Sequence, residues 1–346
     1  KLQKRKQEID SLNNAYTQAW EKNRYAYKKY KFKNRLTPFQ SMAYLLTSIK
    51  QLDVNYSENN GTVLPGLLSA PNWYGYGQTL GGPTIGFLLG SQADIRRTVM
   101  ENGWVSDSEF MTDPYIRMST RELRANLQVM PMNDLRIDIN ALHNYNRNFT
   151  HTGFNYRDPD TGIANPDYTF ANDMVTYSNS VVLLKTAFKD GTAIYQAIRE
   201  NARALSQQMP GALEPNGFKD GYGISNAYIL IPAFRAAVEG KNPKMMTNPK
   251  KAGLPIPNWK ITYSGLRNIP IINGQFSKFD ILHAYQATYT ATGVQSSIDY
   301  FNTLNNLSAT QRDINDDYIN PFTFAQVGYV ENFSPLIGVD VTMRNN

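Results

Sequence analysis

The chain has 346 residues, a net charge of +6, 41% hydrophobic residues and no cysteine. The absence of cysteine excludes disulfides, thiolate metal sites and cysteine nucleophiles, and the absence of a run of eighteen apolar residues excludes a transmembrane helix. Its three histidines, His143, His151 and His283, lack metal-ligand spacing. A membrane barrel remains possible, because barrel strands hide their apolar residues in alternation.

The first segment is basic and predicts a helix over residues 1–32, where Pro and Gly are absent. Residues 1–36 hold eleven Lys/Arg against three Asp/Glu, so the remainder is close to neutral. The basic, aromatic end at 28–31 fits contact with anionic lipid or nucleic acid, but a solvated linking helix explains it as well, and we prefer that interpretation. We therefore expect a basic helical segment at 1–45 and a β-rich portion at 46–346.

Residues 52–57 alternate between apolar and polar and predict a strand, which the turn sequence Asn59-Asn60-Gly61 should end. The stretch 64–103 is rich in glycine. It lacks the Gly-Lys-Ser/Thr of a Walker loop and the glycine spacing of a dinucleotide site. We therefore expect these glycines at bends and close backbone approaches.

Residues 121–150 carry the clearest pattern, two alternating runs joined by the turn sequence Pro131-Met132-Asn133-Asp134. The pattern predicts a hairpin with one apolar and one polar face. The residues expected on the apolar, lipid-facing side are Leu123, Leu127, Val129, Leu135, Ile137 and Ile139. The residues expected on the polar, lumen-facing side are Arg124, Asn126, Gln128, Arg136, Asp138 and Asn140.

The length of the second run, which continues to Phe149, separates two architectures. Soluble strands are mostly about five or six residues long, whereas a strand that crosses a membrane needs roughly nine to eleven. Long alternating strands with a short turn at one end and a loop of about twenty residues at the other are typical of outer-membrane barrels. A soluble β-sandwich with one wet face is the alternative.

The second half predicts further strands around a helical insert near residues 190–253. The expected strands are 171–188, 259–263, 279–290, 322–330 and 337–343. Residues 192–208 predict a helix with Thr192 as its N-cap, and 229–234 fits either a strand or a short helix. The strands at 171–188 and 259–263 should run in the same direction, so an odd number of crossings is needed between them. The only candidate lies at 224–238.

Catalytic motifs are missing: no Gly-x-Ser-x-Gly, His-Glu-x-x-His or EF-hand sequence occurs, so we expect neither an enzyme nor a cofactor. Asp313, Asp316 and Asp317 cluster in one stretch. The cluster could bind a cation, but its spacing fits no familiar metal loop. We expect a solvated loop there.

Several short motifs, in a specific order from Leu64 to Asn346, together resemble one family. They lie at 64–66, 86–96, 101–104, 230–234, 257–266, 283–285 and 333–341, and they include Gly86, Gly90, Gln92, Asp94, Trp104, Trp259 and Pro335. The order is similar to that of the SprA/Sov family, the giant outer-membrane translocon barrels of the type IX secretion system in Bacteroidetes. Each motif alone is modest, and the basic helix carries less of the likeness.

The resemblance implies part of a very wide transmembrane β-barrel that exports folded cargo bearing a C-terminal secretion signal. Its implied partners are a PorV-like shuttle barrel, a plug protein, the cargo and outer-membrane lipids, with no nucleic acid and no cofactor. The chain is far shorter than family members, so we expect it to be a section of a larger protein. The alternatives are another outer-membrane channel or uptake barrel, and a soluble β-rich binding protein.

Overall fold

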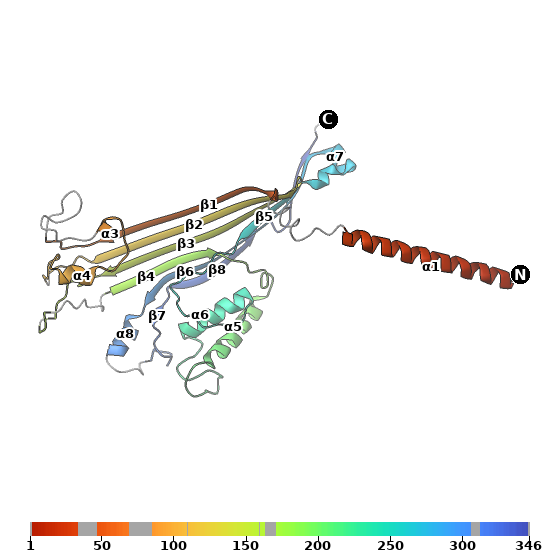
Figure 1. The fold of residues 1–346 in the computed structure, drawn as a ribbon. Helices are drawn as coiled ribbons and strands as arrows, with labels where there is room; N and C mark the ends of the chain where they lie inside the picture. The colour runs from red at the N-terminus through yellow and green to blue at the C-terminus, as the bar shows by residue number, and fades with distance from the viewer. Residues whose placement is uncertain are drawn as a thin grey trace.

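The computed structural model describes residues 2–33, 47–68, 85–108, 110–158, 160–162, 171–305 and 312–344. It is predominantly a β structure with peripheral helices (Figure 1). The strands are β1 (Ile49–Val63), β2 (Tyr115–Met132), β3 (Leu135–His151), β4 (Ala171–Ser180), β5 (Asn258–Tyr263), β6 (Phe276–Ser296), β7 (Phe322–Thr323), β8 (Gln326–Phe333) and β9 (Gly338–Met343). The helices are α1 (Leu2–Lys33), α3 (Ile85–Leu88), α4 (Arg96–Glu101), α5 (Gly191–Ser206), α6 (Ala227–Glu239), η2 (Gly265–Asn268), α7 (Pro270–Gln275) and α8 (Ile298–Asn305).

The described strands form one nine-stranded sheet in which all pairings are antiparallel. The hairpin expected at residues 121–150 is confirmed as β2 and β3, which are longer than predicted. Among the described residues, β1 pairs only with β2, and β8 and β9 pair only with β6. The sheet is therefore open at both edges in this part of the chain, and it does not close into a barrel.

The strands β4 and β5 act as one strand. Both lie between β3 and β6, and their registers fit one strand in which Val181 fills the position between Ser180 and Asn258: Ser180 pairs with Thr288, the Val181 amide donates to the Ala287 carbonyl at 3.0 Å, and Trp259 pairs with Tyr285. Residues 182–257, which we call the insert, leave the sheet after Val181 and return to the next position of the same strand. The strand crossing that the sequence analysis required between β4 and β5 is therefore not needed, because β4 and β5 together form one strand that crosses the sheet once.

The insert contains α5 and α6, which pack against each other on one face of the sheet beside β6 and β8 (Figure 1). The ambiguous segment 229–234 is helical and lies within α6, with Pro232 inside the helix. The predicted N-cap of the preceding helix was wrong. Asp190, not Thr192, occupies that position, and its side chain makes no capping hydrogen bond.

Two further expectations about strand ends were also wrong. The turn expected at Asn59-Asn60-Gly61 is absent, because Asn60 and Gly61 pair with Ser119 and Met118 on the long partner strand β2. The strand expected at 171–188 ends at Ser180, just before the insert begins. The helix expected at 1–32 is confirmed as α1, and its side chains from Asp10 to Arg24 are all exposed.

A hydrophobic cluster lies at one end of the sheet, where α4 covers the start of β2 and the end of β3 (Figure 1). Its buried members are Val99, Met100, Val105, Tyr115, Phe149 and Phe154. The glycine-rich stretch supplies bends there, since Gly66, Gly90 and Gly103 have positive φ. Its glycines between residues 69 and 84, like residues 163–170 of the loop after β3, lie outside the described residues.

Candidate functional site

The sheet has two chemically different faces, which the strand register defines. Residues at paired positions on neighbouring strands share a face. Leu52, Leu127 and Ile139 are paired in sequence across β1, β2 and β3, and Ile139 is paired with Trp259 on β5. All six apolar residues predicted for the hairpin therefore share one face, and the six polar residues share the other.

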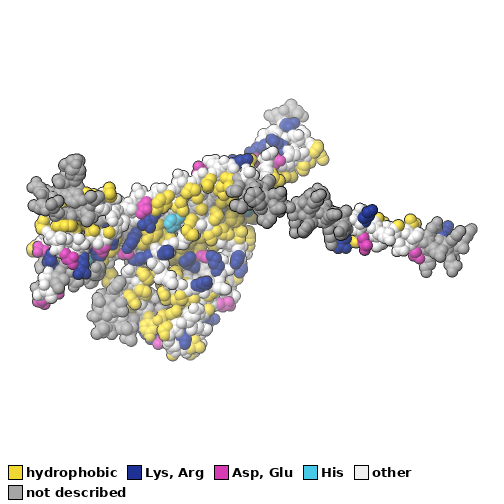
Figure 2. Space-filling view, viewed as in Figure 1, with side chains coloured by type: hydrophobic (Ala, Val, Ile, Leu, Met, Phe, Trp, Pro, Cys, Tyr) yellow, Lys and Arg dark blue, Asp and Glu magenta, His cyan; other side chains and the backbone are white. Residues whose placement is uncertain are grey.

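The apolar face continues across the sheet to β9. We call this surface the apolar belt, and it consists of Leu52, Val54, Leu123, Leu127, Val129, Leu135, Ile137, Ile139, Ile261, Ile281, Val339 and Val341. Leu52, Val54 and Val339 are 62%, 59% and 60% exposed, whereas Val129 is buried. Figure 2 shows hydrophobic side chains gathered over the strands on the face that also carries the insert. Such a broad exposed apolar surface is characteristic of an interaction with another surface or with lipid.

The height of the belt is close to that of a membrane band. Leu135 and His143 on β3 are separated by about 27 Å along the strand at about 3.4 Å per residue. With a strand tilt of about 40°, this distance covers roughly 20 Å of depth, against an apolar band of about 25 Å in outer-membrane barrels.

The opposite face carries amides and locally paired charges. Asn126 lies directly across from Asn140, and Gln128 lies across from Asp138. The Arg136 guanidinium donates to both Asp138 carboxylate oxygens at 2.9 Å, and Arg124 donates to Glu122 at 2.5 Å. Side-chain charges that are paired along their own strands leave a hydrated, mixed surface with little apolar area.

The junction between β4 and β5 is held by side chains that replace missing strand contacts. Asn258 is buried, and its carboxamide oxygen accepts from the Ala287 amide at 3.0 Å while its nitrogen donates to the Ala287 carbonyl at 3.2 Å. The Ile256 amide donates to the Ser180 carbonyl at 2.8 Å, which ties the returning chain to the departing one. Side-chain and backbone hydrogen bonds to the sheet therefore anchor the base of the insert.

Aromatic side chains on the sheet hold the insert against it. Tyr289 packs on Tyr177 and Tyr329, with ring centroids 5.9 and 4.8 Å apart, and the Arg235 guanidinium of α6 lies 4.7 Å from the Tyr289 ring. The Tyr329 hydroxyl donates to Glu239 at the end of α6 at 2.5 Å. Both apolar packing and charge therefore fix α6 on β4, β6 and β8.

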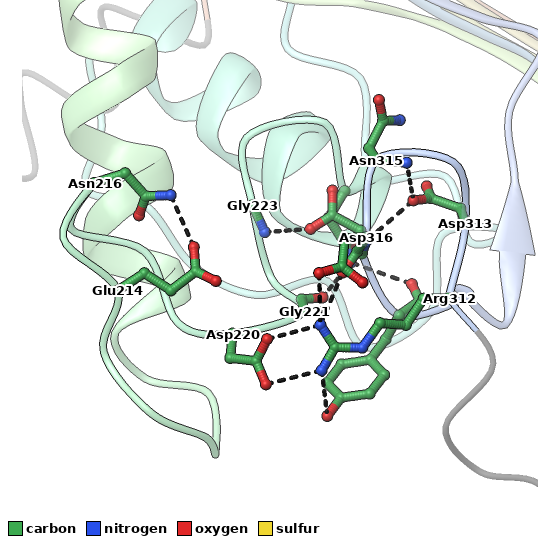
Figure 3. Close-up of polar contacts among 12 residues, drawn as sticks. Glu214, Asn216, Asp220, Gly221, Gly223, Arg312, Asp313, Asn315 and Asp316 are labelled. Carbon is green, nitrogen blue, oxygen red and sulfur yellow. Dashed lines mark hydrogen bonds and ion pairs between the residues drawn. The ribbon is translucent and has the colours of Figure 1, made fainter.

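The acidic cluster is exposed at Asp313 and Asp316, as expected of a solvated loop, but Asp317 docks against the insert. Asp317 is 3% exposed, and it accepts from the Gly223 amide at 2.5 Å and from the Ser225 hydroxyl at 2.7 Å. The Arg312 guanidinium binds both carboxylate oxygens of Asp220 at 2.7 and 2.8 Å (Figure 3). Asp313 caps its own loop by accepting from the backbone amides of Asn315 and Asp317.

The charges of these contacts act on nearby ionisable groups. Hydrogen bonds from Arg312 hold the pKa of Asp220 below its ordinary value. Burial alone would raise the pKa of Glu239, but hydrogen bonds from Lys241 and Tyr329 and the charge of Arg235 together lower it. Both carboxylates are therefore charged at neutral pH. Among the described residues, no group of three or more His, Asp or Glu side chains is arranged to hold a metal ion.

The family-motif residues lie in two places. Gly86 lies in the short helix α3, and Gly90 follows this helix with a φ of 80° close to the carbonyl of Asn60. The Gln92 amide donates to the Gly61 carbonyl at 3.3 Å. Asp94 pairs with the buried Arg96 at 2.5 Å, and Trp104 packs against the cluster beneath α4. The contacts of Gly90, Gln92, Asp94 and Trp104 fasten the β1–β2 connection to the sheet.

Trp259 and Pro335 lie at the other place, on β5 and in the turn between β8 and β9. The Trp259 ring stacks on Tyr285 at 4.7 Å, within the row of the apolar belt. The Pro335 carbonyl accepts from the Ala284 amide at 2.9 Å. The motif residues at both places have structural contacts, and none has an arrangement that suggests catalysis.

Sequence reasoning did not predict the structural contacts of Asn258 and Asp317, and it missed the tyrosines beneath the insert. The alternation of their strands predicts the face on which Tyr289 and Tyr329 lie, but it does not indicate that a helix covers them. Asn258 had one local signal, its position between Pro257 and a strand. Comparisons with protein-family models and with curated proteins find no match to this chain. In the part of the chain that the structure describes, no helix is long and apolar enough to cross a membrane.

Proposed function

We propose that this chain forms part of the wall of a protein-conducting outer-membrane barrel, a translocon of the type IX secretion class. The observation that carries the proposal is the exposed apolar belt on one face of an antiparallel sheet whose other face is hydrated. Lipid would cover the belt, and the polar face would line the lumen. The motif order that resembles the SprA/Sov family supports the choice of translocon.

The alternative of a soluble β-sandwich requires a second layer over the belt. In the described residues, the insert covers the sheet mainly beside β6 and β8, and Leu52 and Val54 on β1 stay more than half exposed. Lipid contact accounts for this exposure without another protein layer. The open edges at β1 and β9 fit a wall that continues with further strands, because an unpaired edge within a membrane leaves backbone groups without partners.

The polar face suits the passage of folded protein. Its exposed amides at Asn126 and Asn140 and its paired charges at Arg136 and Asp138 hold water and offer cargo little apolar area. We propose that folded cargo carrying a C-terminal signal passes along this face. A PorV-like shuttle barrel and a plug protein complete the proposed assembly.

Site-specific labelling tests the orientation. The sequence contains no cysteine, so single cysteines in place of Val54 or Val339 on the belt, and of Asn126 or Asn140 on the polar face, give unique labels within this chain. The variants would be made in the whole protein in its native outer membrane, and spin labels would be compared for relaxation by oxygen and by a water-soluble nickel complex. We expect oxygen to dominate at the belt positions and nickel to dominate at the polar positions.

Equal access of the nickel complex to all four labels would contradict the membrane orientation and favour a soluble β-rich protein. The secretory role is tested separately by isolating the native assembly in mild detergent. Recovery of a shuttle barrel with trapped, folded cargo supports export. Recovery of a barrel with small nutrients and no protein cargo would favour an uptake channel and overturn the translocon assignment.

A further inference from the structure

A basic pocket of ≈ 490 Å³ lies on the belt side of the sheet, between β2, β3, β4 and the loop that follows α6. Four of its lining residues are the cations Arg121, Arg147, Lys250 and Lys251, and only one, Asp173, is acidic. These charges come from the sheet and from the insert together, so the pocket exists only when the insert is docked.

The local ion pairs use up only part of this positive charge. Arg147 and Lys250 both contact Asp173, at 2.7 and 2.9 Å, and Arg121 contacts Glu58 at 3.1 Å. Lys251 is exposed and forms no ion pair with any residue that the structure describes. Four cations facing two carboxylates leave an excess of positive charge, which favours the binding of an anion.

The pocket lies at the border of the apolar belt. On β2, Arg121 is followed on the same face by Leu123, two residues away. On β3, Tyr145 and His143, whose rings stack at 6.5 Å, separate Arg147 from the apolar positions that follow. The side chains therefore change from charged to aromatic to aliphatic along the strand. This order matches the headgroup, interfacial and hydrocarbon layers of a membrane.

We propose that this pocket binds the phosphate-bearing headgroup of an anionic membrane lipid, whose acyl chains lie along the apolar belt. Arg121, Arg147, Lys250 and Lys251 hold the phosphate oxygens, because guanidinium and ammonium groups donate charge-assisted hydrogen bonds to phosphate. Since Lys250 and Lys251 belong to the insert, the lipid bridges the insert to the barrel wall. This inference rests on the proposed membrane orientation of the belt.

The test uses the whole protein purified from its native membrane in mild detergent and exchanged into nanodiscs. Native mass spectrometry would count retained lipids in discs of zwitterionic phosphatidylcholine that contain a small share of phosphatidylglycerol. The double variant Arg121→Gln/Lys251→Gln removes two charges and leaves the pairs with Asp173 intact. We expect each lost charge to lower anionic-lipid retention about fivefold.

The matched control is Lys244→Gln, which removes an exposed charge from the same loop outside the pocket and should leave retention unchanged. Unchanged retention in the double variant would overturn the inference, as would displacement of the lipid by millimolar inorganic phosphate, which would indicate a site for free phosphate. If the belt labels report lipid while no anionic lipid is retained, the inference fails and the proposed function stands. If the labels report water, both fail.

Discussion

Ser180 and Asn258 occupy neighbouring stretches of one strand, although the whole insert separates them in the sequence. Ser180 pairs with Thr288 on β6 and Asn258 pairs with Asn140 on β3, and the Asn258 carboxamide binds both backbone groups of Ala287 at the junction. A side chain therefore supplies the contact that an uninterrupted backbone would make.

Replacing Asn258 with alanine should destabilise this junction. The buried amide of Ala287 would lose its acceptor, while its carbonyl would still accept from Val181 at 3.0 Å. One unsatisfied buried donor costs about 1–3 kcal/mol in the free energy of unfolding. Denaturant unfolding of the detergent-solubilised protein measures this. Asn242→Ala, an exposed asparagine of the same insert, should have little effect, and equal stability of the two variants would show that the Asn258 contact is dispensable.

Replacing Asp317 with alanine should release the acidic loop from the insert. The carboxylate binds a backbone amide and a hydroxyl, and hydrogen bonds to charged groups contribute about 1.5–3 kcal/mol. Hydrogen exchange of the Gly223 amide should therefore accelerate by at least about tenfold. The exposed neighbour Asn315 provides the control, since among the described residues no hydrogen bond joins its side chain to the insert. Unchanged protection of Gly223 would count against the docking role.

The contact between Arg312 and Asp220 should weaken in acid. Because the pKa of Asp220 is lowered in the folded protein, its contribution is complete above the ordinary aspartate pKa of about 4 and is lost as the pH falls through the lower value. Limited proteolysis of the loop at 312–318 across this acid range should show increasing cleavage. In Asp220→Asn this pH dependence should disappear, and its persistence would assign the effect to another group.

A charge on the belt should be costly, and the same charge on the reverse face should be tolerated. Leu127→Arg places a guanidinium on the belt, which the proposed function assigns to lipid, and such a charge costs about 2–4 kcal/mol near a bilayer midplane. Asn126→Arg, one position away, adds the same group to the polar face. We expect a lower amount of assembled protein in the outer membrane for the first variant alone. Equal amounts would contradict the assignment of the two faces.

Apolar substitutions on the polar face should slow export. Asn126→Leu together with Asn140→Leu creates an apolar spot from two residues that lie directly opposite each other. At about 25 cal/mol per Å² of buried apolar surface, contact over about 100 Å² would hold cargo by roughly 2–3 kcal/mol. We expect secretion to fall severalfold, with cargo retained on the isolated assembly. Val339→Leu on the belt is the control, and normal export by the double variant would argue against a lumenal face.

The sequence predicted the long hairpin well because period-two alternation is a local property of the strand. Leu123, Leu127 and Val129 could be assigned to one face without knowing any partner strand. The direction of that face, toward lipid or toward a second layer, is not a local property, and it remains a prediction. The resemblance to a translocon family likewise remains a prediction, and its motif residues proved to make structural contacts within the sheet.

The interrupted strand could not be predicted, because a strand pattern does not show where the chain leaves the sheet. Ser180 ends β4 with no proline or glycine beside it, and the run beyond it stays apolar since Val182 and Leu183, at the start of the insert, pack in the cluster that contains Tyr285 and Ala287 of β6. The turn predicted at Asn60-Gly61 failed for a related reason, since pairing with β2 outweighed the local turn preference. Asp317 looked like a surface residue because its partners, Gly223 and Ser225, are far away in the sequence.

The single strand that β4 and β5 form together also affects how such a protein can change during evolution. Because the strand resumes in the position that it left, joining Val181 directly to Asn258 would preserve every pairing of the surrounding sheet. Gain, loss or exchange of the segment between them would alter neither the number of strands nor the circumference of a wall built from them. The chain can therefore acquire a different segment at this position while the sheet around it stays unchanged.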